Sequence, residues 1–153
     1  MIAWRICKAS RAKTAFDGEG ARLFPGRWND KGVGVVYCAG SLALACLEVF
    51  VHLDPDDLPD DLVSIRVEIP GSLAVEDIDP TKLPKSWRKV PGPPALRRLG
   101  SEWVAEGRSV ALRVPSAVIP DEHNVLLTPR HPDMAKVVFG LPRRFTFDPR
   151  MRR

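Results

Sequence analysis

The chain has 153 residues, of which 44% are hydrophobic and 27% are charged, and its formal net charge is +4. This size and composition predict one globular domain over residues 1–153, and the lack of any run of about 18 apolar residues argues against a membrane span. The N-terminus does not have the layout of a signal peptide, and the three cysteines form no C-x-x-C pair. We therefore expect a cytoplasmic protein with reduced thiols.

The first half of the chain predicts strands and one helix. Ile2 to Ile6 and Val33 to Cys38 are short apolar segments, and such segments favour strands. Ser41 is a typical N-cap for a helix that runs to about His52. The acidic, proline-broken stretch 54–61 ends that helix.

The second half predicts more strands and a second helix. Residues 62–69 form a half-buried strand with alternate residues inward, namely Val63, Ile65, Val67 and Ile69. A helix can begin at Pro94, run to about Glu106 and close at Gly107, and its inward residues would be Leu96, Leu99, Trp103 and Val104. Short strands are expected at 110–114, 124–128 and 145–147, and 131–139 is left unassigned. The pattern predicts an α+β fold with a mixed, mainly antiparallel sheet.

Glu48 is the residue that stands out most. It lies in the stretch Ser41–Val51, which is otherwise almost wholly apolar. Such a helix is usually buried, and a charge within it needs a partner or a function. The glycine-punctuated loop 24–32 lies upstream and carries Arg27, whose planar guanidinium matches phosphate oxygens. We expect Arg27 and Glu48 to face each other across a small-molecule site.

Several familiar sites are excluded by the sequence. Residues 32–37 begin like a dinucleotide fingerprint, but Tyr37 stands where the third glycine belongs, and a strand follows rather than a helix. There is no G-x-x-x-x-G-K-[ST] phosphate loop and no G-x-S-x-G elbow. The histidines lack zinc-ligand spacing with the cysteines, so no metal is expected. His52 lies four residues after Glu48, where a local hydrogen bond or a surface position is favoured over a shared metal.

Structural explanations exist for most other candidates. Alone, Arg27 is typical of a surface ion pair, and Trp28 and Tyr37 are typical of core aromatic residues, although the Tyr37 hydroxyl needs a partner. Ser116 follows a strand end and a proline, the usual place for a turn residue. The tail from Leu141 is basic, which is typical of a solvated terminus or of contact with nucleic acid or an acidic partner. Its cations are Arg143, Arg144, Arg150, Arg152 and Arg153.

Four separated patches agree in order and context with one known family. The patches are Gly26–Asn29, Val36–Tyr37, Leu42–Glu48 and Val114–Val118. They resemble the RES-domain toxins of bacterial type II toxin–antitoxin pairs, a family named for an arginine, a glutamate and a serine. The stretch Asn124–Pro129 is also similar, with Thr128 where another asparagine is expected, and it makes Asn124 a candidate for cofactor binding.

The resemblance implies a fold similar to that of ADP-ribosylating toxins and a reaction on NAD⁺ as substrate, without a metal. The nicotinamide–ribose bond would be cleaved and ADP-ribose passed to a host protein, to water or to phosphate, which would arrest growth. The implied partner is an antitoxin with a helix-turn-helix domain that blocks the active site, so that nucleic acid is contacted only through the antitoxin. A homodimer stays open.

Residue roles within this resemblance follow from the chemistry of NAD⁺. Loss of nicotinamide passes through an oxocarbenium-like state, which an ionised Glu48 can stabilise while it binds a ribose hydroxyl. Arg27 would neutralise the diphosphate or orient Glu48, and Arg5 is a weaker candidate for the phosphates. Tyr37 would contact nicotinamide or the ribose edge. Ser116 would bind the nicotinamide amide or position Glu48.

Two other functions stay open. The basic tail is compatible with a nucleic-acid-binding module, although aromatic residues are only 7% of the chain, few for a stacking surface. Salt-sensitive binding of RNA or DNA, with NAD⁺ left intact, would favour that function. A non-enzymatic interaction domain is the third possibility. Growth arrest that survives replacement of both Arg27 and Glu48 would favour it.

Overall fold

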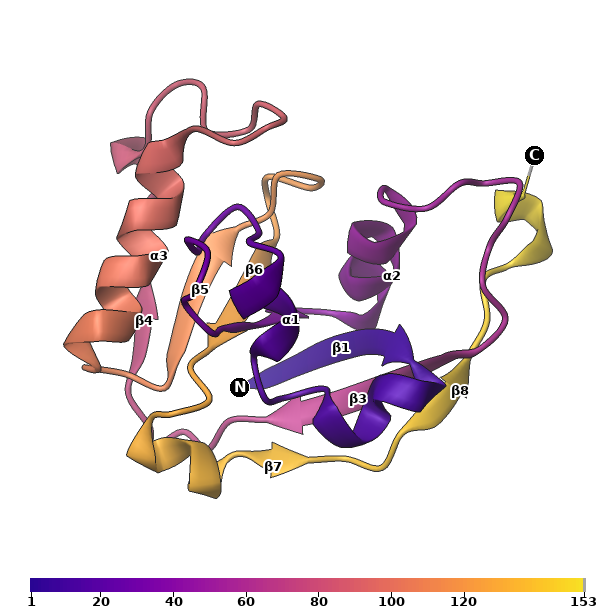
Figure 1. Ribbon diagram of the computed structural model, residues 1–153, viewed down its shortest axis with the longest axis horizontal. Coiled ribbons are helices and arrows are strands. Elements are labelled where there is room, and N and C mark those ends of the chain that lie inside the picture. Colours follow the sequence, from indigo (N-terminus) through magenta and orange to yellow (C-terminus); the bar gives the residue numbers. More distant parts are fainter. Residues whose placement is uncertain (153) are drawn as a thin grey trace.

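The computed structural model describes residues 1–152, and a curled β-sheet organises them (Figure 1). The sheet runs in the order β4-β5-β6-β2-β1-β3-β7, and β8 pairs with β3 beside β7. β4 and β5 are parallel, and the other pairs are antiparallel. The strands are β1 Ile2–Lys8, β2 Val36–Ala39, β3 Leu62–Glu68, β4 Val75–Asp77, β5 Ala111–Pro115, β6 His123–Leu127, β7 Val138–Phe139 and β8 Arg143–Phe145. The expected α+β fold with a mixed, mainly antiparallel sheet is confirmed.

Two helices cover one face of this sheet. The helix α2 (Leu42–Phe50) packs Leu44 and Ala45 against β1, β2 and β3, and α3 (Pro94–Glu106) packs Leu96 and Trp103 against β5 and β6. Figure 1 shows α2 and α3 well apart. The short helix α1 (Glu19–Leu23) and the 3-10 helices η1 Ala9–Thr14, η2 Pro80–Lys82, η3 Pro132–Lys136 and η4 Pro149–Met151 complete the described elements. None of the helices among residues 1–152 is long and apolar enough to cross a membrane.

The expected helix ends are largely confirmed. The Ser41 side chain accepts a hydrogen bond from Leu44 N at 3.1 Å and so caps α2, which ends at Phe50, two residues before the expected His52. The helix α3 begins at Pro94 and closes at Gly107, which adopts a left-handed φ of 60°. The expectation that Leu99 faces the core is wrong, because this side chain is 37% exposed. Gly100 occupies the buried stripe between Leu96 and Trp103 instead.

Alternation along the strands assigns residues to the two faces. Val36 and Cys38 of β2 lie in the cluster on the face away from α2 and α3, together with Ala3, Val125 and Leu127. Tyr37 therefore lies on the helix-covered face, and so does Asn124, which pairs with Ala39. These two polar side chains lie on the part of the sheet between the areas covered by α2 and α3.

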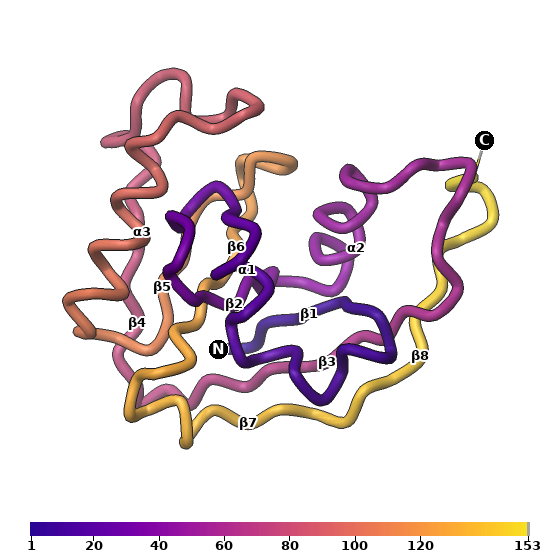
Figure 2. The backbone as a smooth tube through the Cα atoms, viewed as in Figure 1, coloured from indigo at the N-terminus to yellow at the C-terminus, as the bar shows by residue number. Residues whose placement is uncertain are grey.

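The C-terminal segment returns along the edge of the sheet. The expected strand 145–147 is shifted to β8, and the unassigned residues 131–139 contain η3 and β7. Phe147 follows β8 and places its ring 5.8 Å from that of Phe50, so the segment lies beside the end of α2 (Figure 2). Arg150 forms an ion pair with Asp148 at 2.9 Å. Arg153, which belongs to the predicted basic tail, lies outside the described residues.

Gly100 and Gly20 provide a matched test of how α3 is seated. A Cβ on Gly100 would lie 1.8 Å from the backbone oxygen of Trp28, whereas one on Gly20 would meet nothing within 4 Å. We expect Gly100→Ala to lower the free energy of unfolding by about 1–3 kcal/mol, because overpacking exceeds the gain in helix propensity. Gly20→Ala should leave stability unchanged or raise it slightly. Urea denaturation measures both, and a stabilised Gly100→Ala variant would contradict this packing.

Candidate active site

The Glu48 carboxylate is held through one of its two oxygens. Oε1 accepts hydrogen bonds from Ser116 Oγ at 2.7 Å and from Asn124 Nδ2 at 2.6 Å. Oε2 has no protein partner among residues 1–152 and is not one of the buried unpaired atoms. The carboxylate is therefore fixed in direction by its inner oxygen, and its outer oxygen is available to a ligand.

The protein fixes the hydroxyl of Ser116 completely. Ser116 is fully buried just after β5, and its Oγ accepts the backbone N–H groups of Val118 at 3.1 Å and Ile119 at 3.0 Å. A hydroxyl offers two lone pairs and one proton, so with both lone pairs occupied its proton is directed to Glu48. This geometry makes Ser116 a positioning residue and leaves it no free lone pair for a nucleophilic role.

Asn124 has an unused acceptor next to Glu48. Its Nδ2 must face the carboxylate, because the opposite amide orientation would set two oxygens against each other at 2.6 Å. Its Oδ1 is then buried without a hydrogen-bond partner. Buried polar atoms are rarely left unpaired, and a ligand that donates an N–H or O–H would satisfy this one.

The loop that carries Arg27 is anchored by a buried asparagine. Asn29 is fully buried, and its Oδ1 accepts hydrogen bonds from the Tyr37 hydroxyl at 2.7 Å and from Gly26 N at 2.9 Å. The same hydroxyl accepts from Trp28 N at 3.0 Å. A Cβ on Gly26 would lie 2.7 Å from the Tyr37 oxygen, so this glycine permits close approach to Tyr37 rather than to a ligand.

Tyr37 therefore has a structural partner for its hydroxyl, as the sequence required. Burial raises the pKa of Tyr37 strongly, while the hydrogen bond from Trp28 and the nearby charges of Arg97 and Arg27 oppose that rise. The hydroxyl consequently stays protonated and holds the loop. Asn29 was included in the Gly26–Asn29 patch of the sequence but was given no role of its own. Its place next to Trp28, a typical core residue, was the signal that could have found it, because a buried asparagine amide needs hydrogen-bond partners.

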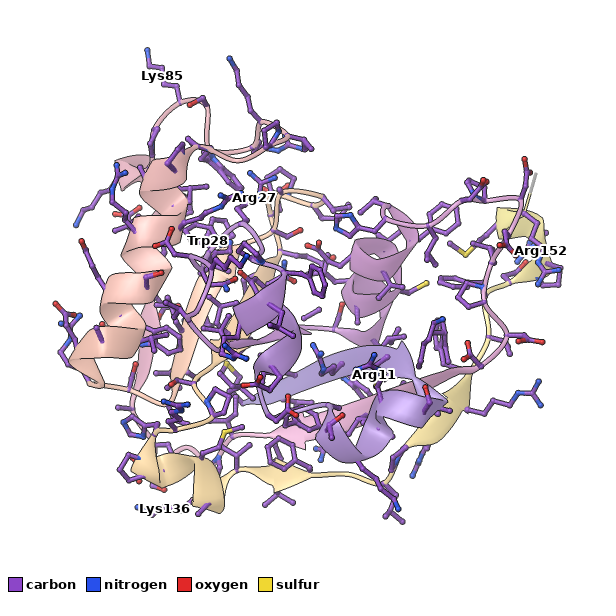
Figure 3. The ribbon with its side chains drawn as sticks, in the orientation of Figure 1. Arg11, Arg27, Trp28, Lys85, Lys136 and Arg152 are labelled. Carbon is purple, nitrogen blue, oxygen red and sulfur yellow. The ribbon has the colours of Figure 1, made fainter. Side chains whose placement is uncertain are left out.

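Arg27 is bound by backbone carbonyls across a long separation in sequence. Its Nη1 donates to Trp87 O at 2.6 Å and to Lys89 O at 2.9 Å, and Gly92 packs against it. Figure 3 shows Arg27 and Trp28 beside α3, below the loop that carries Lys85. Burial lowers the pKa of Arg27, and the charge of Glu48 opposes this shift. Arg27 thus lies within electrostatic range of Glu48, although the two form no ion pair among the described residues.

Arg5 lies one strand away from the Glu48 cluster. Its Nη1 donates to the backbone oxygen of Tyr37 at 2.7 Å, and its Nε is buried without a partner. Alternation in β1 places it on the face that carries Ala3, and its charge partly offsets the burial that raises the pKa of Cys38 to about 12. Arg5 thus binds the backbone of β2 on the face of the sheet away from α2, and it does not lie beside Glu48.

Two surface hollows lie outside the Glu48 cluster. One, of about 250 Å³, is formed at the ends of β5 and β6 and includes Asp77, Arg113 and His123. The other, of about 220 Å³, lies between α1 and α3 and includes Arg22 and Ser101. Glu48 lines neither of them. Within residues 1–152, no group of three or more His, Cys, Asp or Glu side chains is arranged to hold a metal ion.

The comparisons with known proteins agree with one another. The family model of the RES domain matches residues 2–148. The chain is 39% identical over 152 residues to the "Prs ADP-ribosylating toxin" of Sphingobium sp. (strain YBL2), covering 97% of this chain and 94% of the relative. It is 34% identical over 153 residues to "Toxin Res" of Yersinia enterocolitica, covering 99% of this chain and all of the relative.

A solved structure shares the fold. A chain of the M. tuberculosis MbcT–MbcA toxin–antitoxin complex superposes with a TM-score of 0.75 at 20% sequence identity, covering 95% of this chain and 84% of that one. At this identity the likeness concerns the fold alone. The family model and the curated relatives, each matched over nearly the full length, establish the kinship independently. The chain therefore belongs to the RES-domain family of toxins.

Proposed function

We propose that this protein is the toxin of a toxin–antitoxin pair and that it cleaves the nicotinamide–ribose bond of NAD⁺. The observation that carries the proposal is the geometry of Glu48, whose inner oxygen is pinned by Ser116 and Asn124 while its outer oxygen is free. The name of the Sphingobium relative, an ADP-ribosylating toxin, supports the same chemistry. An ADP-ribosylating enzyme transfers ADP-ribose, and NAD⁺ is the substrate class that the family implies.

Glu48 would act on the ribose next to nicotinamide. As the bond breaks, its electron pair leaves with nicotinamide, which departs neutral, and positive charge develops on the ribose. The outer oxygen of an ionised Glu48 would accept a hydrogen bond from a ribose hydroxyl and stabilise that charge. Because Ser116 and Asn124 hold the carboxylate beforehand, little reorganisation is needed when the charge develops.

The other site residues would hold the substrate. The orphaned Oδ1 of Asn124 fits a ribose hydroxyl or the carboxamide N–H of nicotinamide. Arg27 would attract the diphosphate from the loop side, whereas Arg5, on the face of the sheet away from α2, would act on it only through its charge. Tyr37 would present its ring to the ribose edge while its hydroxyl holds the loop. Arg27 forms no ion pair within residues 1–152, so its charge remains available to the substrate.

The acceptor of ADP-ribose would be a host protein, water or phosphate. Incubation of the purified protein with NAD⁺, with phosphate present or absent, and with cell lysate separates these cases. Free ADP-ribose or its phosphate ester indicates degradation, and a labelled protein band indicates transfer. The proposed partner is a cytoplasmic antitoxin with a helix-turn-helix domain that covers the site, and a homodimer is compatible with the proposal.

Replacing Glu48 tests the charge-stabilising role. We expect Glu48→Gln to lower kcat/KM for NAD⁺ by about 10²–10³, the usual cost of losing one positioned electrostatic contact. The rate of nicotinamide release, measured by chromatography, gives kcat/KM. Glu102→Gln, which removes an exposed carboxylate from α3, serves as the control and should retain full activity. Near-normal turnover by Glu48→Gln would overturn the proposed function.

Asn124→Asp tests the hydrogen bond to Glu48 through its pH dependence. The substitution preserves shape but sets a second carboxylate 2.6 Å from the first, so the pair retains a proton and one pKa rises. Since the proposal needs an ionised Glu48, the acidic limb of the pH–rate profile should move to higher pH. An unchanged profile would show that Asn124 does not contact Glu48 in the working enzyme.

Tyr37→Phe separates the ring of Tyr37 from its hydroxyl. The variant keeps the aromatic surface but leaves Trp28 N without a partner and Asn29 Oδ1 with only its bond from Gly26 N, so the free energy of unfolding should fall by about 1–3 kcal/mol. Because the loop carries Arg27, KM for NAD⁺ should rise more than kcat falls. Chemical denaturation and steady-state kinetics check the two effects. A variant as stable as the wild type would contradict the anchoring role.

A further inference from the structure

Arg97 is a cation without a protein partner in the described part of the chain. Its Nε is buried and unpaired, and its side chain forms no ion pair and no hydrogen bond within residues 1–152. Other arginines of the chain are neutralised, among them Arg22, Arg66, Arg108, Arg113 and Arg150. Because a buried donor is rarely left unpaired, the lack of an acceptor at Arg97 calls for a functional explanation.

The position of Arg97 on α3 directs it to the Arg27 loop. Ser101, one helical turn further on, donates to Asp30 Oδ2 at 2.8 Å and accepts from Asp30 N at 3.0 Å. Residues four apart share a helix face, so Arg97 borders the same loop as Ser101. Arg98, the next residue, is exposed on a different side of the helix.

The start of α3 brings Arg97 to the loop that carries Arg27. Gly92, just before α3, packs against the Arg27 side chain, and Gly100, three residues after Arg97, packs against Trp28. The charges of Arg97 and Arg27 both oppose the burial that raises the pKa of Tyr37, which agrees with this placement. The backbone oxygens of Trp87 and Lys89 fix Arg27 in place through Nη1. Glu48 acts on Arg27 from a distance, but no carboxylate within residues 1–152 forms an ion pair with either guanidinium, so an anion bound between the two cations would relieve their repulsion.

We propose that Arg97 and Arg27 together form the subsite that binds the diphosphate of the dinucleotide. A guanidinium presents several donors in a planar fork, which matches phosphate oxygens, and the diphosphate carries two negative charges for the two cations. The inference rests on the proposed function and deepens it, since it assigns to α3 a substrate-binding residue beyond those of the Glu48 cluster. Free phosphate has the same chemistry and is the alternative source of the anion.

Binding of ADP tests this subsite without any turnover. Isothermal titration calorimetry of the full chain would compare ADP, inorganic pyrophosphate and adenosine on wild type, Arg97→Gln, Arg97→Lys and Arg98→Gln. We expect Arg97→Gln to weaken ADP binding by about 10- to 100-fold, the loss that follows from removing a hydrogen bond to a charged group. Arg97→Lys should recover part of it, because charge is restored without the fork. Adenosine binding and the Arg98→Gln variant should match wild type.

The outcomes separate the possible errors. Unchanged ADP binding by Arg97→Gln, equal losses in Arg98→Gln, or no ADP binding by wild type would each overturn the inference. A loss for pyrophosphate alone, with ADP unaffected, would show a site for free phosphate and would also overturn it. The thermal midpoint of unfolding of each variant identifies misfolding. If Arg97→Gln is misfolded, the ADP affinity of Arg97→Lys decides whether the inference stands. Turnover by Glu48→Gln bears only on the proposed function, because ADP binding does not depend on cleavage.

Discussion

The double hydrogen bond to one oxygen of Glu48 is the interaction on which the site depends. Its donors come from positions 68 and 76 residues further along the chain, and each is fixed by its own part of the sheet. Ser116 is held by the turn after β5, and Asn124 by its place in β6 opposite Ala39. The direction of the carboxylate therefore depends on assembly of the sheet, which brings Ser116 and Asn124 to it. The helix α2 alone does not set that direction.

A second polar centre, around Asn29, fixes the loop that carries Arg27, as Ser116 fixes the Glu48 side chain of α2. Asn29 joins Gly26 and Tyr37 through one oxygen and uses its amide nitrogen on Ala21 O and Val33 O. Gly26 and Trp28 thus serve the shape of this loop, and Arg27 between them is held by Trp87 O and Lys89 O without a carboxylate partner among the described residues. The cost of burying an asparagine is offset because every polar atom of its side chain is used.

Local signals in the sequence were sufficient for α2, α3 and most of the longer strands, but not for α1, for β4 or for the contacts between elements. Ser41, Pro94 and Gly107 mark helix ends through backbone chemistry that operates within a few residues, and those ends were predicted closely. Leu99 was misplaced because the tight approach of Trp28 to Gly100 sets the rotation of α3, and a hydrophobic pattern does not record such an approach. The short helix α1 was not predicted, because its N-cap position is Gly18, which has a left-handed φ and no side chain that could cap the helix.

The candidate site shows the same division. Glu48 could be singled out because a charge among apolar residues violates a composition rule, and Ser116 followed from the resemblance. The partners of Arg27 could not be found, since they are backbone oxygens 60 and 62 residues away and any residue type offers such an oxygen. Arg97 gave no signal either, because in sequence it is one arginine of an ordinary amphipathic helix.

The order in which the strands are made has a consequence for the cell that produces this protein. β6 lies between β5 and β2 in the sheet, yet it is translated long after α2 has left the ribosome. Until that strand inserts, Glu48 lacks Asn124, and β5, which is followed by Ser116, has no β6 to join it to β2. The Glu48 cluster is therefore completed only late in synthesis, and a fragment truncated before residue 124 would lack one of the two donors that orient this carboxylate.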